Sequence, residues 1–257
     1  GVVPGVLLAV LFSAYCVGIA ILKPEDAPTP APHGEGPRYT RSEILGGLGI
    51  LALVLLVIGG LWGGVFNPTE AAGFGAVFAL AIGVLKGMRG RALMQAIYAA
   101  GRTTAPIMIL LITASMYSRL LAFGGVINTI QDFFLGIGGG VVVVVALMML
   151  VWMLLGMIID SVSIILLTVP IFAPIAASLG VDPVAFAIFG ILVIEAGLLT
   201  PPFGLLVYTV KGAIPDPDVK LSTIFRGAVP YWIMILVAAT AVIMVPQLAT
   251  WLPSIGI

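Results

Sequence analysis

The sequence predicts an all-α protein that is embedded in a membrane and crosses it several times. Of its 257 residues, 61% are apolar and only 9% are charged, and the mean hydropathy is +1.25. A soluble domain carries about 25% charged residues, and a chain this apolar has more core-type side chains than a soluble core can bury. Composition therefore excludes a soluble enzyme, a nucleic-acid-binding protein and a disordered chain. The apolar runs are about 20 residues long, which predicts spanning helices rather than the alternating strands of an outer-membrane barrel.

Residues that often carry chemistry are scarce. The net charge is zero, with 11 basic and 11 acidic residues, which excludes a polybasic arm or an acidic tail. Cys16 lies in an apolar run and is expected to be a small core residue. His33 lies in a polar loop and is expected to be solvated, because a metal site needs several ligands. The sequence has none of the common nucleotide-binding, metalloprotease or serine-hydrolase motifs, so we expect no enzyme.

The first three spans are clear. Apolar runs predict helices over about 2–22, 44–62 and 69–85. Proline and charge in 23–43 predict an extended loop, and 86–91 predicts a short basic loop. Because no basic stretch precedes the first run, we expect part of a longer polypeptide rather than a signal peptide.

The middle of the chain is less regular. Residues 105–122 are span-like, and the glycine-rich segment 123–140 predicts either a short span with a loop or a hairpin that enters the membrane and returns. Residues 141–180 contain one charged residue, Asp160. As one helix they would be about 60 Å long, twice the hydrocarbon thickness of about 30 Å. A break is therefore predicted at GMIIDSVS.

Prolines predict further interruptions. Pro170 and Pro174 are expected to disturb the helix that follows Asp160. Thr200-Pro201-Pro202 predicts unwound backbone inside the apolar block 184–210, because adjacent prolines cannot both lie in a regular helix interior. A last span is expected over about 228–250.

Basic residues predict the orientation. They gather in the loops 23–43, 86–91 and 211–226. Two spans separate the first two loops, so both lie on one side, which the positive-inside rule makes cytoplasmic. The tail after residue 250 has no basic residue and is placed outside, with Trp251 as an interfacial anchor.

Charged residues inside apolar runs are costly and tend to mark function. Glu70 follows Asn67-Pro68-Thr69 and fits the first turn of a capped helix, in which Asn67 or Thr69 accepts backbone N–H groups. Arg119 either snorkels to the interface or is an electrostatic partner for an anion or a buried carboxylate.

Asp160 predicts a cation site more directly. It lies at the expected break beside Gly156, Ser161 and Ser163. A broken helix frees backbone carbonyls, and a carboxylate with hydroxyls adds hard oxygen ligands, a set that suits Na⁺. The alternative is a tight turn with a solvated carboxylate.

The second break has its own polar residues. Glu195 either pairs with a basic residue, stays protonated or hydrogen-bonds the unwound segment. Thr200 offers a hydroxyl and a carbonyl oxygen, and Gly197 permits close approach of another segment. Two broken segments about 40 residues apart are the pattern expected for the midplane site of a secondary transporter.

Three strings resemble the large membrane subunit of the TRAP family (tripartite ATP-independent periplasmic transporters): GGVFNPTEAA, GMIIDSVSIILLTVPIFAPIAASLGVDPVAF and EAGLLTPPFGLLVYTVKG. The resemblance covers essentially the whole chain and corresponds to the C-terminal half of that longer subunit. It implies one half of an inverted-repeat architecture. We expect residues 1–102 to be partly scaffold, 103–212 to hold a transport-type region with a re-entrant hairpin and broken helices, and 213–257 to form a cytoplasmic loop and the last span.

The resemblance also implies a function. Such subunits lie in the bacterial inner membrane and take up organic acids with a Na⁺ gradient and without ATP. A periplasmic binding protein delivers the substrate, and a small membrane subunit completes the complex. Na⁺ is expected as coupling ion, with no further cofactor. Glu195 is more similar to the dicarboxylate-type branch than to the sialic-acid type.

The residues expected at the ion and substrate site share a position at one of the two breaks: Gly156, Asp160, Ser161 and Ser163 at the first, and Glu195, Gly197, Thr200, Pro201 and Pro202 at the second. The resemblance assigns the cation itself to Gly156, Asp160, Gly197 and Thr200.

Other functions remain open. Glu70-Ala71-Ala72 is similar to the ATPase-docking loop of an ABC-type import permease, although Glu70 opens an apolar span. A non-transporting membrane scaffold or assembly factor is another alternative. An aspartyl intramembrane protease is disfavoured, because Asp132 and Asp182 lie beside loops and leave Asp160 without a facing aspartate.

Overall fold

The computed structural model describes residues 1–24, 40–214 and 219–255. Most of the polar loop predicted over 23–43, including His33, lies outside the described residues. The same holds for residues 215–218 and for the last two residues of the tail.

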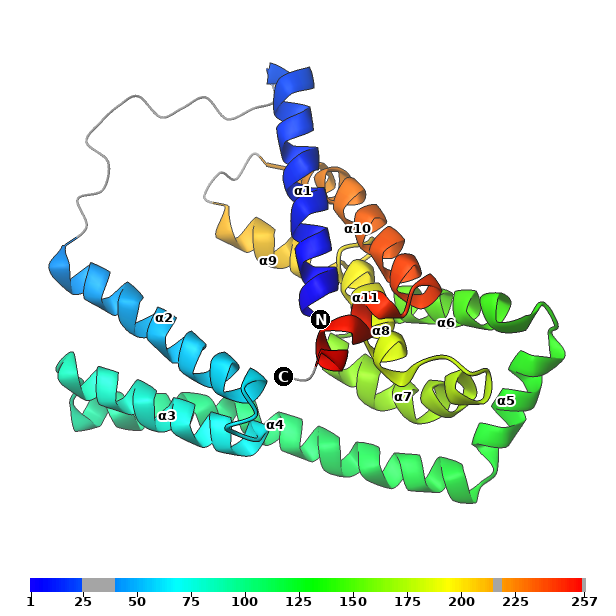
Figure 1. Cartoon of the computed structure of the whole chain (residues 1–257), viewed down its shortest axis with the longest axis horizontal. Coiled ribbons are helices and arrows are strands. Elements are labelled where there is room, and N and C mark those ends of the chain that lie inside the picture. The colour runs from blue at the N-terminus through cyan, green and yellow to red at the C-terminus, as the bar shows by residue number, and fades with distance from the viewer. Residues whose placement is uncertain (25–39, 215–218, 256–257) are drawn as a thin grey trace. The chain divides into compact units, whose positions relative to one another are not determined.

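Helices account for nearly all of the described residues (Figure 1). In chain order they are α1 (Val2–Leu22), α2 (Arg41–Trp62), α3 (Pro68–Leu85), α4 (Gly90–Phe123), α5 (Val126–Gly136), α6 (Gly140–Gly156), α7 (Ser161–Ser178), α8 (Pro183–Leu198), α9 (Leu205–Ala213), α10 (Leu221–Met244) and α11 (Gln247–Ser254).

The prediction of an all-α, multi-span membrane protein is confirmed. Within the described ranges, six helices are long and apolar enough to cross a membrane: α1, residues Glu43–Trp62 of α2, α3, α4, α7 and α10. Helices α6 and α8 are shorter apolar helices.

The chain divides into two compact units, which we describe separately. The first contains residues 1–24 and 107–252, and the described residues of the second are 40–106 and 253–255. The functional division predicted at residues 102 and 212 remains a prediction.

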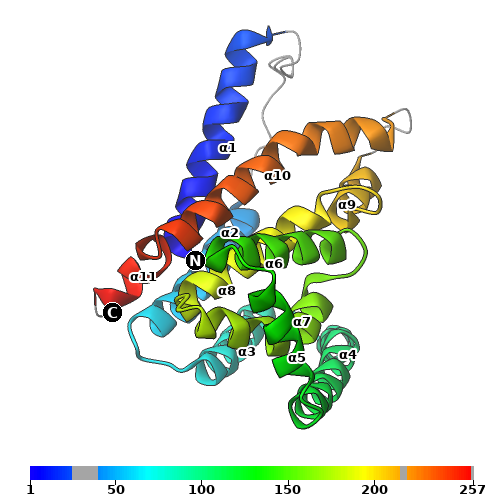
Figure 2. The same ribbon diagram turned by 90° about the vertical axis from the view of Figure 1, so that its right-hand side faces the viewer.

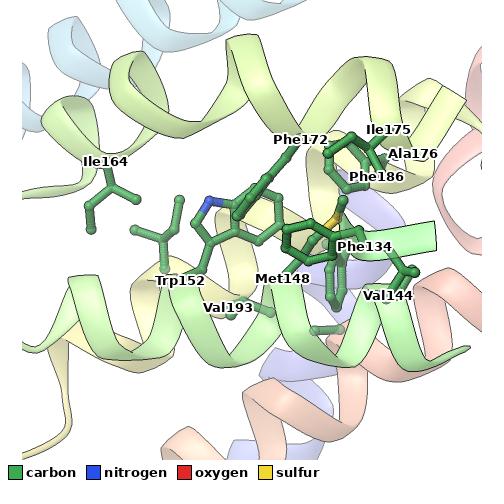
Figure 3. Packing of buried hydrophobic residues seen from close by; sticks show 14 residues of the cluster. Phe134, Val144, Met148, Trp152, Ile164, Phe172, Ile175, Ala176, Phe186 and Val193 are labelled. Atoms are coloured by element: carbon green, nitrogen blue, oxygen red, sulfur yellow. The ribbon is translucent and has the colours of Figure 1, made fainter. Parts of the chain in front are cut away.

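Helices α6, α7 and α8 form the centre of the first unit. In Figure 3, Val144 lies at the end of the cluster occupied by Ile175, and Trp152 at the end occupied by Ile164, so α6 and α7 are antiparallel. Helix α8 follows the direction of α6, because Gly190 lies beside Trp152 and Gly197 beside Gly156. The C-terminal ends of α6 and α8 therefore meet at one end of this three-helix bundle.

Trp152 is the central side chain of the bundle and is 1% exposed. Its ring lies 5.3–5.8 Å from the rings of Phe172, Phe186 and Phe189, and Figure 3 shows it together with Phe172 and Phe186. Its indole N–H donates to the Thr168 hydroxyl at 2.7 Å, and that hydroxyl donates to the carbonyl of Ile164 at 2.7 Å. Both polar groups of this buried pair are thus satisfied, and one hydrogen bond joins α6 to α7.

Helix α10 packs against α8, and α1 packs against α10 (Figure 2). The second contact is aromatic, since Tyr231 of α10 lies edge-to-face against Phe12 and Tyr15 of α1. Cys16 lies at the same place, with its Sγ 3.1 Å from the Tyr231 hydroxyl. The prediction that Cys16 is a core residue is wrong, because its side chain stays exposed beside Tyr231.

In the second unit, α2 and α3 pack against each other, and both begin with a capping box. The N–H of Thr40 donates to the Glu43 carboxylate at 2.7 Å. At the start of α3, the N–H of Asn67 donates to the Glu70 carboxylate at 3.0 Å, and the N–H of Glu70 donates to the side-chain oxygen of Asn67 at 2.9 Å. Pro68 occupies the first turn. These caps satisfy N–H groups that no helical carbonyl can reach.

Two segments have different bounds from those that the sequence predicts. The basic loop ends before Gly90, where α4 begins and continues for 34 residues through Pro106 to Phe123. Its first turns contain Ala, Leu, Met and Gln, which favour helix. The helix therefore begins well before the apolar segment that starts at residue 105. The predicted last span is two helices, α10 and α11, because the chain leaves the helix at Val245 before Pro246.

The prolines of α7 do not interrupt it. The helix runs from Ser161 to Ser178 through Pro170 and Pro174. Each proline removes one backbone hydrogen bond. Burial of Phe172, Ile175 and Ala176 in the core holds this part of the helix in place.

Candidate ion and substrate site

The two predicted breaks meet where α6 and α8 end. A Cβ atom built on Gly156 would lie 2.8 Å from the Cα of Gly197, and one built on Gly197 would lie 2.9 Å from the Cα of Gly156. Real side chains do not approach backbone this closely. The two helices therefore touch backbone to backbone at these positions, and both chain breaks follow within four residues.

Asp160 caps α7 at the first break. Its Oδ1 accepts the backbone N–H of Ser163 at 3.0 Å, and its Oδ2 accepts the Ser163 hydroxyl at 2.6 Å. The residue is extended and exposed, as expected for an N-cap at a surface. The carboxylate thus has a structural role, and its remaining lone pairs stay available to a cation.

Thr200 lies at the second break and is 3% exposed. Its hydroxyl donates to the carbonyl of Gly197 at 2.7 Å, and its backbone N–H donates to the same carbonyl at 3.0 Å. Pro201 and Pro202 follow outside any helix, as predicted, and α9 begins after Gly204. The proline pair therefore separates two helices that the hydropathy alone would join.

The other predicted residues lie close by in the chain but make fewer contacts. Ser161 opens α7 and is partly exposed. Glu195 is partly exposed and lies on the outer face of α8, one turn after Ile191, which is 47% exposed. The structure thus joins Gly156 with Gly197 directly, and places Glu195 on the outer face of the same helix end.

The structural interpretation of Glu70 is confirmed, since its carboxylate and amide complete the capping box with Asn67. Arg119 is exposed on α4. Asp182 caps α8 by accepting the N–H groups of Val184 and Ala185, both at 2.9 Å.

The donor set at the two breaks is made of oxygen atoms. Among the described residues, no three His, Cys, Asp or Glu side chains gather as a metal cluster. The breaks instead offer one carboxylate, the hydroxyls of Ser163 and Thr200, and helix-end carbonyls. Hard oxygen ligands with a single charge fit a monovalent cation better than a transition metal.

Two features near the breaks were not predicted from the sequence: the close packing at Gly204 and the hydrogen bond between Trp152 and Thr168. Gly204 has φ +56°, and a Cβ atom there would lie 2.5 Å from the ring of Phe225 and 3.2 Å from the carbonyl oxygen of Thr200. A glycine directly after Pro-Pro-Phe is a turn signal that could have found it. No local pattern predicts the Trp152–Thr168 bond, because it joins two helices.

Comparison with known proteins identifies the class of protein. Residues 1–248 match the family described as the tripartite ATP-independent periplasmic transporter, DctM component. The chain belongs to this family of transporter permease components. It is therefore a multi-pass protein of the bacterial inner membrane and not an enzyme.

Individual relatives agree with this assignment. The chain is 32% identical over 98% of its length to the ectoine/5-hydroxyectoine TRAP transporter large permease protein of Ruegeria pomeroyi, covering 58% of that protein. It is 30% identical over 78% of its length to the sialic acid large permease protein of Vibrio cholerae, covering 47% of it. It is 28% identical over 99% to the C4-dicarboxylate large permease protein of Pseudomonas aeruginosa, covering 58%. The chain thus spans about half the length of these relatives.

Proposed function

We propose that this chain forms part of a permease that takes up a small organic acid by Na⁺-coupled alternating access. The observation that carries the proposal is the backbone contact of Gly156 with Gly197, which brings two helix breaks together. Broken helices offer free carbonyls and helix termini to an ion and an anionic substrate, as in other secondary transporters. Asp160 would supply the one carboxylate and Thr200 a hydroxyl or carbonyl oxygen.

The relatives support the substrate class. Their names refer to sialic acid, ectoines and C4-dicarboxylates, most of which are organic acids. We propose a carboxylate substrate, and the similarity of the Glu195 segment favours the dicarboxylate-type branch. A periplasmic binding protein would deliver the substrate, and a small membrane subunit would complete the complex.

The test separates the capping role of Asp160 from ion binding. Asn caps helices as well as Asp, so Asp160→Asn should leave thermal stability nearly unchanged while removing the charge. In proteoliposomes that hold the complete permease, its small subunit and the binding protein, we expect Asp160→Asn to raise the Na⁺ concentration for half-maximal uptake at least tenfold. Asp182→Asn is the matched control, because Asp182 has the same capping role at α8.

Three results would contradict the proposal. Unchanged Na⁺ dependence in the double variant Asp160→Ala/Thr200→Ala would exclude this cation site. Uptake that requires ATP would favour an ABC-type permease, and a complex that neither transports nor gains stability from Na⁺ or substrate would favour a scaffold.

A further inference from the structure

All charged residues in the part of the chain around α4 are basic. Between Glu70 and Asp132 the sequence contains no acidic residue, but it contains five basic ones: Lys86, Arg89, Arg91, Arg102 and Arg119. Within this part, no carboxylate competes for the positive charges.

The first turns of α4 arrange polar residues on one face. Arg91, Gln95, Tyr98 and Arg102 follow one another at spacings of four, three and four residues. With about 100° of rotation per residue, they fall within an arc of about 60° on the helix surface. All four are exposed, and Gln95, Tyr98 and Arg102 line a common groove. The opposite face carries only apolar residues: Leu93, Ala96, Ile97 and Ala100.

The length of α4 places this face at the edge of the membrane. The helix has 34 residues and would be about 51 Å long, whereas the hydrocarbon core is about 30 Å thick. The part that follows Arg102, residues 103–123, would by itself be about 31 Å long, enough to cross that core. Residues 90–102 therefore lie outside the hydrocarbon, on the side of the basic loop that precedes α4, which the positive-inside rule makes cytoplasmic.

We propose that the stripe of Arg91, Gln95, Tyr98 and Arg102 binds the phosphate groups of anionic phospholipids in the cytoplasmic leaflet. A guanidinium matches a phosphate with two parallel hydrogen bonds, and Tyr is favoured at headgroup depth. The apolar face opposite is suited to the acyl boundary, the arrangement of an interfacial helix. The two arginines are about 16 Å apart along the helix, so they hold two different headgroups.

The test measures lipid binding rather than uptake, so it does not depend on the proposed function. The complete permease is purified in detergent and titrated with phosphatidylglycerol or phosphatidylcholine, and bound lipid is counted by native mass spectrometry. A basic side chain near an anionic surface changes affinity about fivefold. We expect Arg91→Gln and Arg102→Gln each to weaken phosphatidylglycerol binding about fivefold, and the double variant about 25-fold.

Arg119→Gln is the matched control, because it removes the same charge from α4 at a position outside the stripe. It should leave phosphatidylglycerol binding unchanged, and added salt should weaken binding to the wild type and to this control more than binding to the Arg91→Gln/Arg102→Gln variant. Equal retention of phosphatidylglycerol by the wild type and the Arg91→Gln/Arg102→Gln variant would overturn the proposal. Equal binding of the two lipids to the wild type would overturn it as well.

Discussion

At the scale of single residues, two glycines, which have no side chain, determine how closely α6 and α8 approach. Gly156 and Gly197 leave room only for hydrogen atoms, and the neighbouring atoms are backbone. A backbone contact cannot be relieved by a side-chain rotation, so a methyl group at either position has to push the helices apart.

We therefore expect Gly197→Ala to destabilise the protein by about 1–3 kcal/mol, the usual cost of overpacking a core, and to reduce uptake. Gly227→Ala in α10 is the control, because no atom lies within 4 Å of its added Cβ. That change should be neutral or stabilising, since alanine favours a helix over glycine by about 1 kcal/mol. Thermal unfolding in detergent compares the two, and equal melting temperatures would refute the close contact.

The cap at Glu70 could be predicted from the sequence, because both partners of the Asn67–Glu70 box lie within four residues. The capping of α7 by Asp160 was not predicted, and its role as a cation ligand stays a prediction. The contact of Gly204 with Phe225 could not be predicted, because it depends on how α10 returns to the end of α8.

At the scale of helices, the hairpin of α6 and α7 is joined by one buried hydrogen bond. Thr168 accepts the indole N–H of Trp152 two helical turns from Asp160. A donor left unpaired in an apolar core is costly, so this bond fixes the register of one helix against the other.

Replacing Thr168 with valine should cost about 1–3 kcal/mol, because the buried indole N–H loses its acceptor. Thr240→Val is the matched control. Thr240 makes the same bond to the carbonyl four residues earlier, to Leu236 at 2.8 Å, but is exposed. A melting temperature lowered only in Thr168→Val is expected. An equal effect in both variants would mean that the bond to Trp152 adds nothing.

Helix interruptions were only partly predictable at this scale. Chain length required the break at Asp160, and adjacent prolines required the one after Thr200. Pro170 and Pro174 gave the same local signal but are kept in a helix by burial of the residues around them. Whether a proline ends a helix thus depends on packing, which the sequence does not display.

At the scale of the whole molecule, composition predicted the all-α membrane fold correctly, because a chain with 9% charged residues has no soluble alternative. The boundaries of the first three spans were also predicted within about three residues. The start of the long α4 was not predicted. Its first part is amphipathic and its second part is apolar, and a search for apolar runs detects only the second.

The predicted orientation can be tested with one cysteine at a time. In a background with Cys16→Ser, Met88→Cys places a thiol in the basic loop before α4. We expect a membrane-impermeant maleimide to label it in inside-out vesicles and not in intact spheroplasts. The Cys16→Ser background without a new cysteine is the control, and only labelling above its level in the same vesicles is counted. Labelling of Met88→Cys from the outside would reverse the topology.

The contact between Gly156 and Gly197 also limits how the sequence can evolve. Most enlargements in a core can be compensated by a smaller neighbouring side chain. Here the neighbour on each side is the main chain, whose atoms are the same in every residue. Neither position can accept a larger residue first and wait for a second change to restore the fit. Variation among descendants of this chain should accumulate around the pair, in the residues that face outward, while the crossing itself stays the same.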